Sequence, residues 1–339
     1  MKKPLTMTIT LLMNSSICFA QEPSNSPIKS TELTIVVASG SGGGFDLYSR
    51  ILARHLTKHF PGRAKIIVKN MPGAAGLAAT NWAYNLAPRD GTTILSTYSA
   101  LIDANLLGNK NAKFDIKKFN WLGSIASSPL ICITWETSPY KDIKQMIGKP
   151  LSAGSTGRTG KSGTTPLLYN EIIGTKFNVI TGYPTEGNTL ALERGEIDAV
   201  CGIGLFTLQA SHPSWFDDKK VNVVSHSSLI RIPELDGVTN ILDITSNTDR
   251  DIVEYGSILE AMGRPYLAPP DVPPDRVKQL RSSFDATMSD REFVQELTKF
   301  KLNSNPLTGD EVQSYINKLY DSPSDLVRRV TEVYVGSDN

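Results

Sequence analysis

Short apolar runs and longer segments of helical periodicity alternate along this chain. The first run, LTIVVA at residues 33–38, is rich in β-branched residues and predicts a buried strand. Apolar residues then recur at helical spacing across residues 45–60, and Pro61-Gly62 ends that segment before a second apolar run at residues 64–69. A strand, a crossover helix and a second strand in this order are typical of a βαβ unit, so we predict a parallel sheet.

The same alternation continues to the end of the chain. Thr308 with Glu311 has the spacing of a capping box, which opens a helix. The pattern predicts strands at residues 92–96, within 121–134, and at 150–153, 177–181 and 197–201, with helices at 76–86, 164–173, 189–194 and through the last quarter. Such alternation indicates an α/β protein.

The N-terminus has the layout of a secretory signal peptide. Lys2 and Lys3 precede an apolar run at residues 5–13, and small residues ending at Ala20 follow, so we expect cleavage after Ala20. The run is shorter than the ~20 residues that span a bilayer. A lipid-modified Cys18 is the alternative, but the bulky Ile17 before it argues against that reading. Residues 21–30 then form a polar tether, and the mature protein is expected in the periplasm.

Charge and length narrow the class of protein further. The chain has 35 basic and 34 acidic residues. This balance gives no broad attraction to nucleic acid or to anionic lipid. A mature chain of about 319 residues exceeds one comfortable hydrophobic core, so two lobes are expected. Cys132 and Cys201 lie in apolar runs, and the sequence leaves open whether they form a disulfide or two buried thiols.

Three unusual loops follow predicted strands, where ligands of parallel α/β sheets bind. The first is SGSGGGFD at residues 39–46, whose glycines allow a close backbone approach to an anion at a helix start. The second is NMPGAAG at residues 70–76, and the third is GSTGRTGKSGTT at residues 154–165. Two facing helix starts can hold a carboxylate, with Arg158 or Lys161 as optional additional charge.

The candidate ligand-binding residues come from these loops and from the ends of other predicted strands. They are Ser41, Gly42, Gly43, Gly44 and Asp46; Gly73 and Ala74; Tyr98 and Ser99; Thr156, Gly157, Thr159, Ser162, Thr164 and Thr165; and Tyr183 and Asp198.

The sequence motifs of nucleotide-binding proteins, serine hydrolases and metal sites are incomplete or absent in this chain. Gly160-Lys161-Ser162 matches only the end of a phosphate-binding loop, because Ser155 stands where the motif needs glycine. The chain has no G-x-S-x-G elbow of a serine hydrolase. His55 and His59 have the spacing of a metal pair on one helix, but exposed helix histidines are commoner, and we assign no metal.

The order of the loops resembles the extracytoplasmic receptors of tripartite tricarboxylate transporters, the Bug proteins. GGGFD at residues 42–46 is similar to the family's first glycine-rich loop, and KNMPGAAG at residues 69–76 to its second. PRDGTTIL at 88–95, GYPTEG at 182–187, the strand motif at 195–198 and RPYLAPPDVPPDRVKQL at 264–280 follow in family order. The match covers essentially the whole mature chain.

This resemblance implies a two-lobed fold of the type II periplasmic-binding-protein kind, each lobe a mainly parallel sheet flanked by helices. The first lobe would comprise residues 31–125 and 245–339, and the second residues 126–244. The lobes would close on a small organic carboxylate, and the receptor would deliver it to integral membrane transporter subunits. The resemblance implies no enzyme activity, catalytic residue, cofactor or nucleic-acid partner, and we expect a monomer.

Two departures from the family pattern limit the transfer of a particular ligand. The first loop starts with Ala38-Ser39-Gly40-Ser41 rather than a proline-rich segment, and Thr165-Pro166 replaces a histidine common near the helix start in the second lobe. An exported hydrolase or isomerase on a similar scaffold, and a ligand-sensing module for a signalling partner, are the alternatives.

Overall fold

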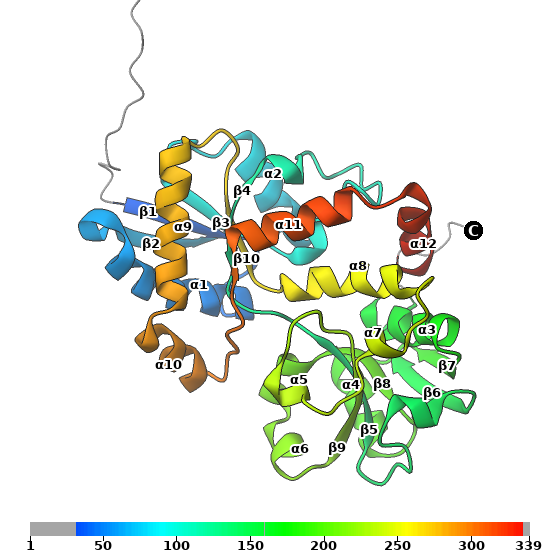
Figure 1. The fold of residues 1–339 in the computed structure, drawn as a ribbon. Helices are drawn as coiled ribbons and strands as arrows, with labels where there is room; N and C mark the ends of the chain where they lie inside the picture. Colours follow the sequence, from blue (N-terminus) through cyan, green and yellow to red (C-terminus); the bar gives the residue numbers. More distant parts are fainter. Residues whose placement is uncertain (1–31, 159, 335–339) are drawn as a thin grey trace, which may run out of the picture.

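A six-stranded sheet forms the centre of the first lobe in the computed structural model, which describes residues 32–158 and 160–334. The predicted signal peptide and tether lie outside these residues. The strands are β1 (Glu32–Val37), β2 (Lys65–Asn70), β3 (Thr93–Ser96), β4 (Asn120–Ser124), β10 (Pro265–Ala268) and β11 (Leu307–Thr308), in the order β11-β4-β10-β3-β1-β2. Figure 1 shows this sheet apart from the strands of the second lobe, with α8 between them.

Helices cover both faces of this sheet because its central strands are apolar on both sides. Leu33, Ile35 and Val37 point to one face, where they pack with α1 (Gly44–His59), α9 (Pro274–Met288) and α10 (Arg291–Lys299). Val36 points to the other face, as expected from the two-residue period of a strand. That face is covered by α2 (Leu77–Asn85), α8 (Arg250–Ala261) and α11 (Gly309–Tyr320), and α12 (Ser324–Tyr334) packs on α8.

The second lobe has two smaller sheets. An antiparallel sheet has the order β8 (Val200–Gly204), β5 (Leu130–Trp135), β9 (Val221–His226), and β6 (Pro150–Ser155) pairs in parallel with β7 (Lys176–Thr181). A parallel bridge between Ala153 and Ala199 joins the two sheets. The helices are α3 (Lys161–Ile172), α4 (Thr185–Glu193), α5 (Leu205–Ser211), α6 (Pro213–Asp217) and α7 (Ile241–Ile244). Short 3₁₀ turns lie at Pro61–Arg63, Ala74–Gly76, Ser99–Leu101, Ile116–Lys118, Ile143–Met146 and Pro233–Leu235.

The prediction of mainly parallel sheets is wrong, although the α/β two-lobed fold is confirmed. β1 pairs in parallel with β2 and β3, but β10 is antiparallel to both β3 and β4. In the second lobe β5 is antiparallel to β8 and to β9. The physical reason is the route of the chain. It leaves the first lobe after β4, builds the second lobe, and returns along α8, after which β10 runs antiparallel to both β3 and β4.

Several predicted boundaries shift by a few residues. The helices predicted to begin at residues 164 and 189 begin at Lys161 and Thr185, because their first turns are polar and carry no apolar period. The strand predicted at 197–201 lies at Val200–Gly204. The capping box is present, since Thr308 Oγ1 accepts from the Glu311 N–H while the Glu311 side chain caps the Thr308 N–H.

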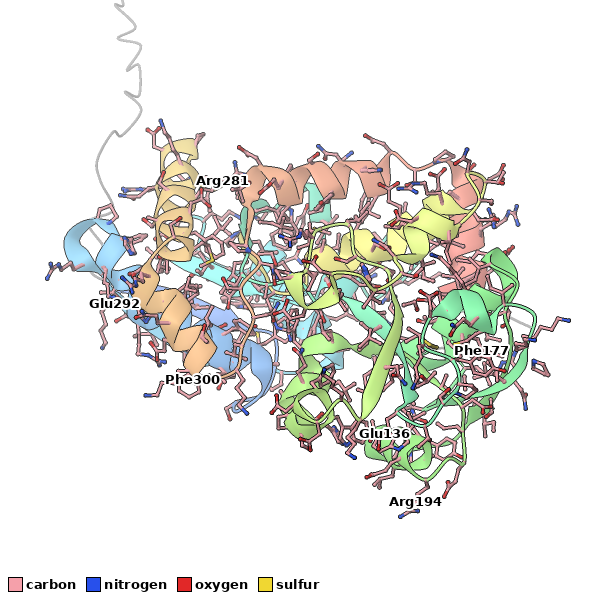
Figure 2. All side chains as sticks on the ribbon, turned by 60° about the horizontal axis from the view of Figure 1, so that its bottom comes forward. Glu136, Phe177, Arg194, Arg281, Glu292 and Phe300 are labelled. Atoms are coloured by element: carbon pink, nitrogen blue, oxygen red, sulfur yellow. A yellow bond between two sulfur atoms is a disulfide. The ribbon has the colours of Figure 1, made fainter. Side chains whose placement is uncertain are left out.

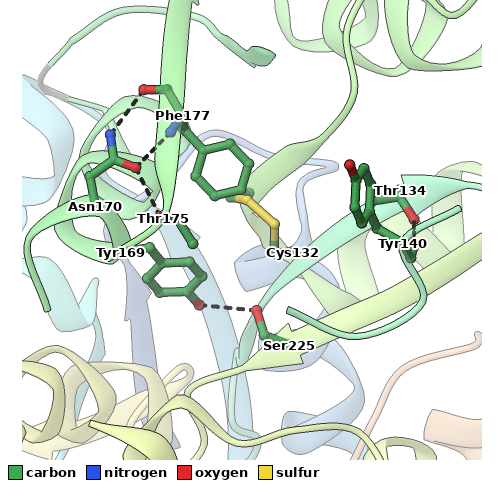
Figure 3. The surroundings of a disulfide bond; sticks show 9 residues. Cys132, Thr134, Tyr140, Tyr169, Asn170, Thr175, Phe177 and Ser225 are labelled. Carbon is green, nitrogen blue, oxygen red and sulfur yellow. Dashed lines mark hydrogen bonds between the residues drawn. A yellow bond between two sulfur atoms is a disulfide. The ribbon is translucent and has the colours of Figure 1, made fainter. Parts of the chain in front are cut away.

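A disulfide joins Cys132 of β5 to Cys201 of β8, two residues that are paired across the antiparallel strands. Both cysteines are fully buried in the core of the second lobe. Figure 3 shows the bond beside the rings of Phe177 and Tyr169. The sequence left open a disulfide or two buried thiols, and the structure contains the disulfide.

Membrane-spanning segments are not found among the described residues, because no helix there is long and apolar enough to cross a bilayer.

Candidate ligand-binding cleft

The first glycine-rich loop connects β1 to α1 and exposes Ser41, Gly42, Gly43 and Gly44. Gly42 has a φ of +86°, which favours glycine, and Gly43 is the N-cap of α1. The first backbone bond of the helix runs from the Leu47 N–H to the Gly43 carbonyl oxygen. Because the N–H groups of the first helical turn have no carbonyl partner within the helix, they face solvent at this end.

Asp46 holds the first loop in place. Its carboxylate accepts hydrogen bonds from the Gly42 N–H (2.8 Å), Arg50 Nε (2.9 Å) and Asn70 Nδ2 (2.9 Å). Burial by itself raises the pKa of this carboxyl, but the bonds from Arg50, Gly42 and Asn70 outweigh burial and hold the pKa at about 2. Asp46 therefore acts as the anchor of the loop.

We expect Asp46→Asn to lower the free energy of unfolding by about 2 kcal/mol, because it weakens charge-assisted hydrogen bonds to Arg50. Since the folded pKa lies below the ordinary value of 3.8, the stabilisation is present above that pH and is lost as the pH falls toward 2. Urea unfolding of both proteins between pH 2.5 and 7 measures the difference. A stability gap that stayed constant down to the lowest pH would contradict this account.

Tyr98 links the first two loops. Gly73, Ala74, Ala75 and Gly76 all have positive φ values, which gives the second loop a tightly turned backbone. Tyr98 packs directly on Gly76, where a Cβ atom would lie 2.6 Å from the ring. The same ring meets Phe45 edge to face at 4.5 Å between centroids. The predicted residues Gly73, Ala74 and Tyr98 thus lie in one group with the start of α1.

Ser162 organises the third loop, between β6 and α3. Its hydroxyl lies 3.2 Å from Ser155 Oγ and from the Thr156 N–H, and 3.3 Å from Thr156 Oγ1. Glycines allow the loop to pack closely, since a Cβ atom on Gly202 would lie 2.1 Å from the Lys161 carbonyl oxygen. Thr165 is buried beneath this contact. The predicted residue Thr159 lies outside the described residues.

A cavity of about 440 Å³ separates the start of α3 from the first lobe. Ser99 and Asp103 line it from the first lobe, Lys161 and Thr164 from the second, and Ser128 from the segment between the lobes. Ser128 is fixed there because its N–H donates to the Glu260 carbonyl oxygen at 2.7 Å. The structure therefore brings the predicted residues Ser99 and Thr164 to one space. Tyr98, whose ring contacts Phe45 of α1, directly precedes Ser99 in the chain.

Two predicted residues have local roles instead. The carboxylate of Asp198 accepts from the Ser152 N–H and hydroxyl, both at 2.7 Å, which places it roughly 10 Å before the carboxyl end of β6. The Tyr183 N–H donates to the Ser155 carbonyl oxygen at 3.2 Å, and its ring packs against the apolar core of the second lobe. Neither side chain lines the cavity between the lobes.

Sequence reasoning missed three charged residues in this region. Arg264 begins the segment similar to the family's C-terminal motif, but no local pattern connects it to the first loop. Asp103 and Glu260 line the cavity between the lobes, and neither belongs to a recognisable motif. Burial raises the pKa of both carboxyls, to about 6 for Asp103 and about 7 for Glu260, although Lys161 lowers each of them.

His55 belongs to an ion-pair cluster between α1 and α10. His55, Asp290 and Glu292 place ligand atoms within 4.8 Å of one another, as a cation site requires. The ammonium of Lys58 lies among them, 3.1 Å from His55 Nδ1 and 2.5 Å from Glu292. Figure 2 shows Glu292 at the outer edge of this helix pair. Lys58 supplies the positive charge there, and the cluster joins two helices of the first lobe.

Solved structures show which class of protein has this fold. A tripartite tricarboxylate receptor-family solute-binding protein from Polaromonas is 17% identical over 89% of this chain and 97% of its own, with a TM-score of 0.69. A Rhodopseudomonas palustris protein solved with adipate is 16% identical over 90% of this chain and 96% of its own, with a TM-score of 0.57. MatC of the same organism, solved with malate, is 18% identical over 89% of this chain and 98% of its own, with a TM-score of 0.54. The fold is that of two-lobed solute-binding proteins.

The family follows from the sequence itself. Residues 49–330 match the model of the tripartite tricarboxylate transporter family receptor, so the chain belongs to this family. It is also 25% identical over 201 residues to a UPF0065 protein from the TAR-I ttuE-ttuC' intergenic region of Agrobacterium vitis. The chain spans just over half the length of that curated relative, 57%.

Proposed function

We propose that this protein is a periplasmic receptor that captures a small organic carboxylate between its two lobes and delivers it to integral membrane transporter subunits. The observation that supports this most directly is the first loop, where glycines expose the N–H groups of the α1 start and Asp46 fixes their direction. A helix start carries unpaired donors and partial positive charge, which favour an anion. The relatives solved with adipate and malate support a carboxylate rather than another anion.

We also propose the lobe boundaries, the export and the oligomeric state of this chain. We assign residues 31–125 and 245–339 to the first lobe and residues 126–244 to the second, because the strands of the two lobes divide in this way. The signal peptide would be cleaved after Ala20, and the mature protein would act as a monomer without a cofactor. Closure would bring the starts of α1 and α3 to the two sides of the ligand, around Ser41–Gly44 and Thr156–Thr165.

Thermal-shift screening of the mature protein against a panel of carboxylic acids tests this function. We expect at least one small acid to raise the Tm, because a ligand that binds only the native state stabilises it. Small-angle scattering with that acid should show a smaller radius of gyration, since closure of two lobes is the motion of this fold class. If no acid in the panel raises the Tm and isothermal calorimetry also detects no binding, the receptor function is wrong.

A further inference from the structure

Arg264 presents a cationic side chain to the start of α1. Its guanidinium carbon lies 4.4 Å from the centre of the Phe45 ring and 5.5 Å from that of Tyr48, so the aromatic rings hold it in place. A Cβ atom on Gly44, the first residue of α1, would lie 3.7 Å from Nη2. The guanidinium and the exposed N–H groups of the helix start therefore share one space.

Arg264 has no anionic partner among residues 32–158 and 160–334. Its Nη1 donates to the Gly263 carbonyl oxygen at 2.7 Å, while its buried Nε has no hydrogen-bond partner in the described chain. Burial lowers the pKa of this guanidinium, the expected effect of removing a charge from water without a counterion. A desolvated cation without an acidic partner is unfavourable unless a bound anion supplies one.

The cavity between the lobes forms a second charged region. Ser99 follows Tyr98 in the chain and lines the cavity between the lobes, and Ser128 of that cavity packs against Gly263, the neighbour of Arg264. The cavity contains two carboxyls, Asp103 and Glu260, and one ammonium, Lys161. The carboxyl of Glu260 already accepts from Ser227 Oγ at 3.0 Å. Lys161 offsets only one of the two acids, so a further negative charge is disfavoured there.

We propose, on the basis of the proposed receptor function, that Arg264 binds the carboxylate of the solute directly and that the receptor prefers acids with a single carboxylate. The planar guanidinium offers the paired donors that a carboxylate accepts, beside the N–H groups of α1. The second carboxylate of a dicarboxylic acid of suitable length would enter the cavity lined by Asp103 and Glu260. This preference separates the protein from its relatives that were solved with adipate and malate.

The pH dependence of this preference follows from the two acids. Lys161 and a hydrogen bond from Tyr255 lower the pKa of Asp103, and Lys161 lowers that of Glu260. The two acids in turn raise the pKa of the phenols that face them, Tyr320 and Tyr169. Because the raised pKa values are about 6 for Asp103 and about 7 for Glu260, both acids are ionised at pH 8 and protonated at pH 5. Rejection of dicarboxylates is therefore strongest at pH 8 and declines toward pH 5.

Calorimetry on the full mature protein with matched pairs of acids tests both the direct contact with Arg264 and the preference for a single carboxylate. The pairs are pentanoate with glutarate, hexanoate with adipate, and benzoate with terephthalate, and the neutral amide of each monoacid reports binding without charge. For the pair that binds, we expect wild type at pH 8 to prefer the monoacid at least tenfold. Arg264→Gln should lower the affinity for the monoacid at least 100-fold and leave the affinity for its amide unchanged. Arg264→Lys should lower the affinity for the monoacid about tenfold, because a lysine cannot form the paired contact.

Controls separate this inference from loss of the fold and from failure of the receptor function. Arg231→Gln changes an exposed arginine that pairs with Asp236, and it should leave all affinities unchanged. Asp103→Asn should reduce the preference for monoacids about tenfold. A folded Arg264→Gln protein with wild-type affinity would refute the direct contact, and a wild type that prefers the diacids would refute the selectivity. Absence of any binding by wild type would instead overturn the receptor function, and the inference with it.

Discussion

Gly43→Asp should weaken solute binding by at least 100-fold while the protein stays folded. The substitution places a carboxylate at the N-cap of α1, where the carboxylate of the solute is expected, and like charges repel at this distance. The backbone tolerates the change, because Gly43 has an extended φ of −81° and ψ of 172°, and only the Gly40 carbonyl oxygen, at 4.0 Å, lies near its Cβ position. Aspartate is also a favourable N-cap residue, so the Tm should not fall. Calorimetry and thermal melting measure the two effects.

Two neutral substitutions serve as controls for this experiment. Gly43→Ala adds only a methyl group to open space and should retain affinity within a few fold. Gly43→Asn matches aspartate in shape without its charge, so the difference between the two isolates the electrostatic effect. Wild-type affinity in a folded Gly43→Asp protein would show that the solute binds elsewhere.

The disulfide should contribute the largest single increment of stability in the second lobe. Cys132 and Cys201 are separated by 69 residues, and closing a loop of that length lowers the entropy of the unfolded chain enough to stabilise the fold by about 4 kcal/mol. Replacing both cysteines by alanine should therefore lower the urea midpoint and the Tm substantially. Both residues are buried away from the cavity between the lobes, so the affinity for the solute should not change.

Wild type measured with and without a thiol reductant provides the matching control. Reduction should reproduce most of the stability loss of the double alanine variant without removing any side chain. Equal unfolding free energies under the two conditions would contradict a stabilising bond between these cysteines. A double variant as stable as wild type would lead to the same conclusion.

Local patterns predicted most of the secondary structure of this protein. The β-branched run that became β1 and the helical period of α1 depend only on residues close together in the chain, and glycine with proline marks their ends. The two lobes also follow from sequence, through length and through the resemblance in loop order. The directions of β10 and β5 did not follow, because strand polarity depends on where the chain re-enters a sheet after a long excursion.

For the candidate site, too, some features could be predicted from the sequence and others only from the tertiary structure. By itself the sequence predicted an anion-binding first loop, because consecutive glycines before a helix expose N–H groups whatever the rest of the fold does. Only the tertiary structure decided which side chains surround it. Arg264 packs on Phe45, which is far from it in the chain, and Asp103 and Lys161 line one cavity from different lobes, since packing brings together residues that no local period relates. The role of Asp46 in fixing the first loop likewise became visible only through its contacts with Arg50 and Asn70, which depend on α1 lying beside the end of β2.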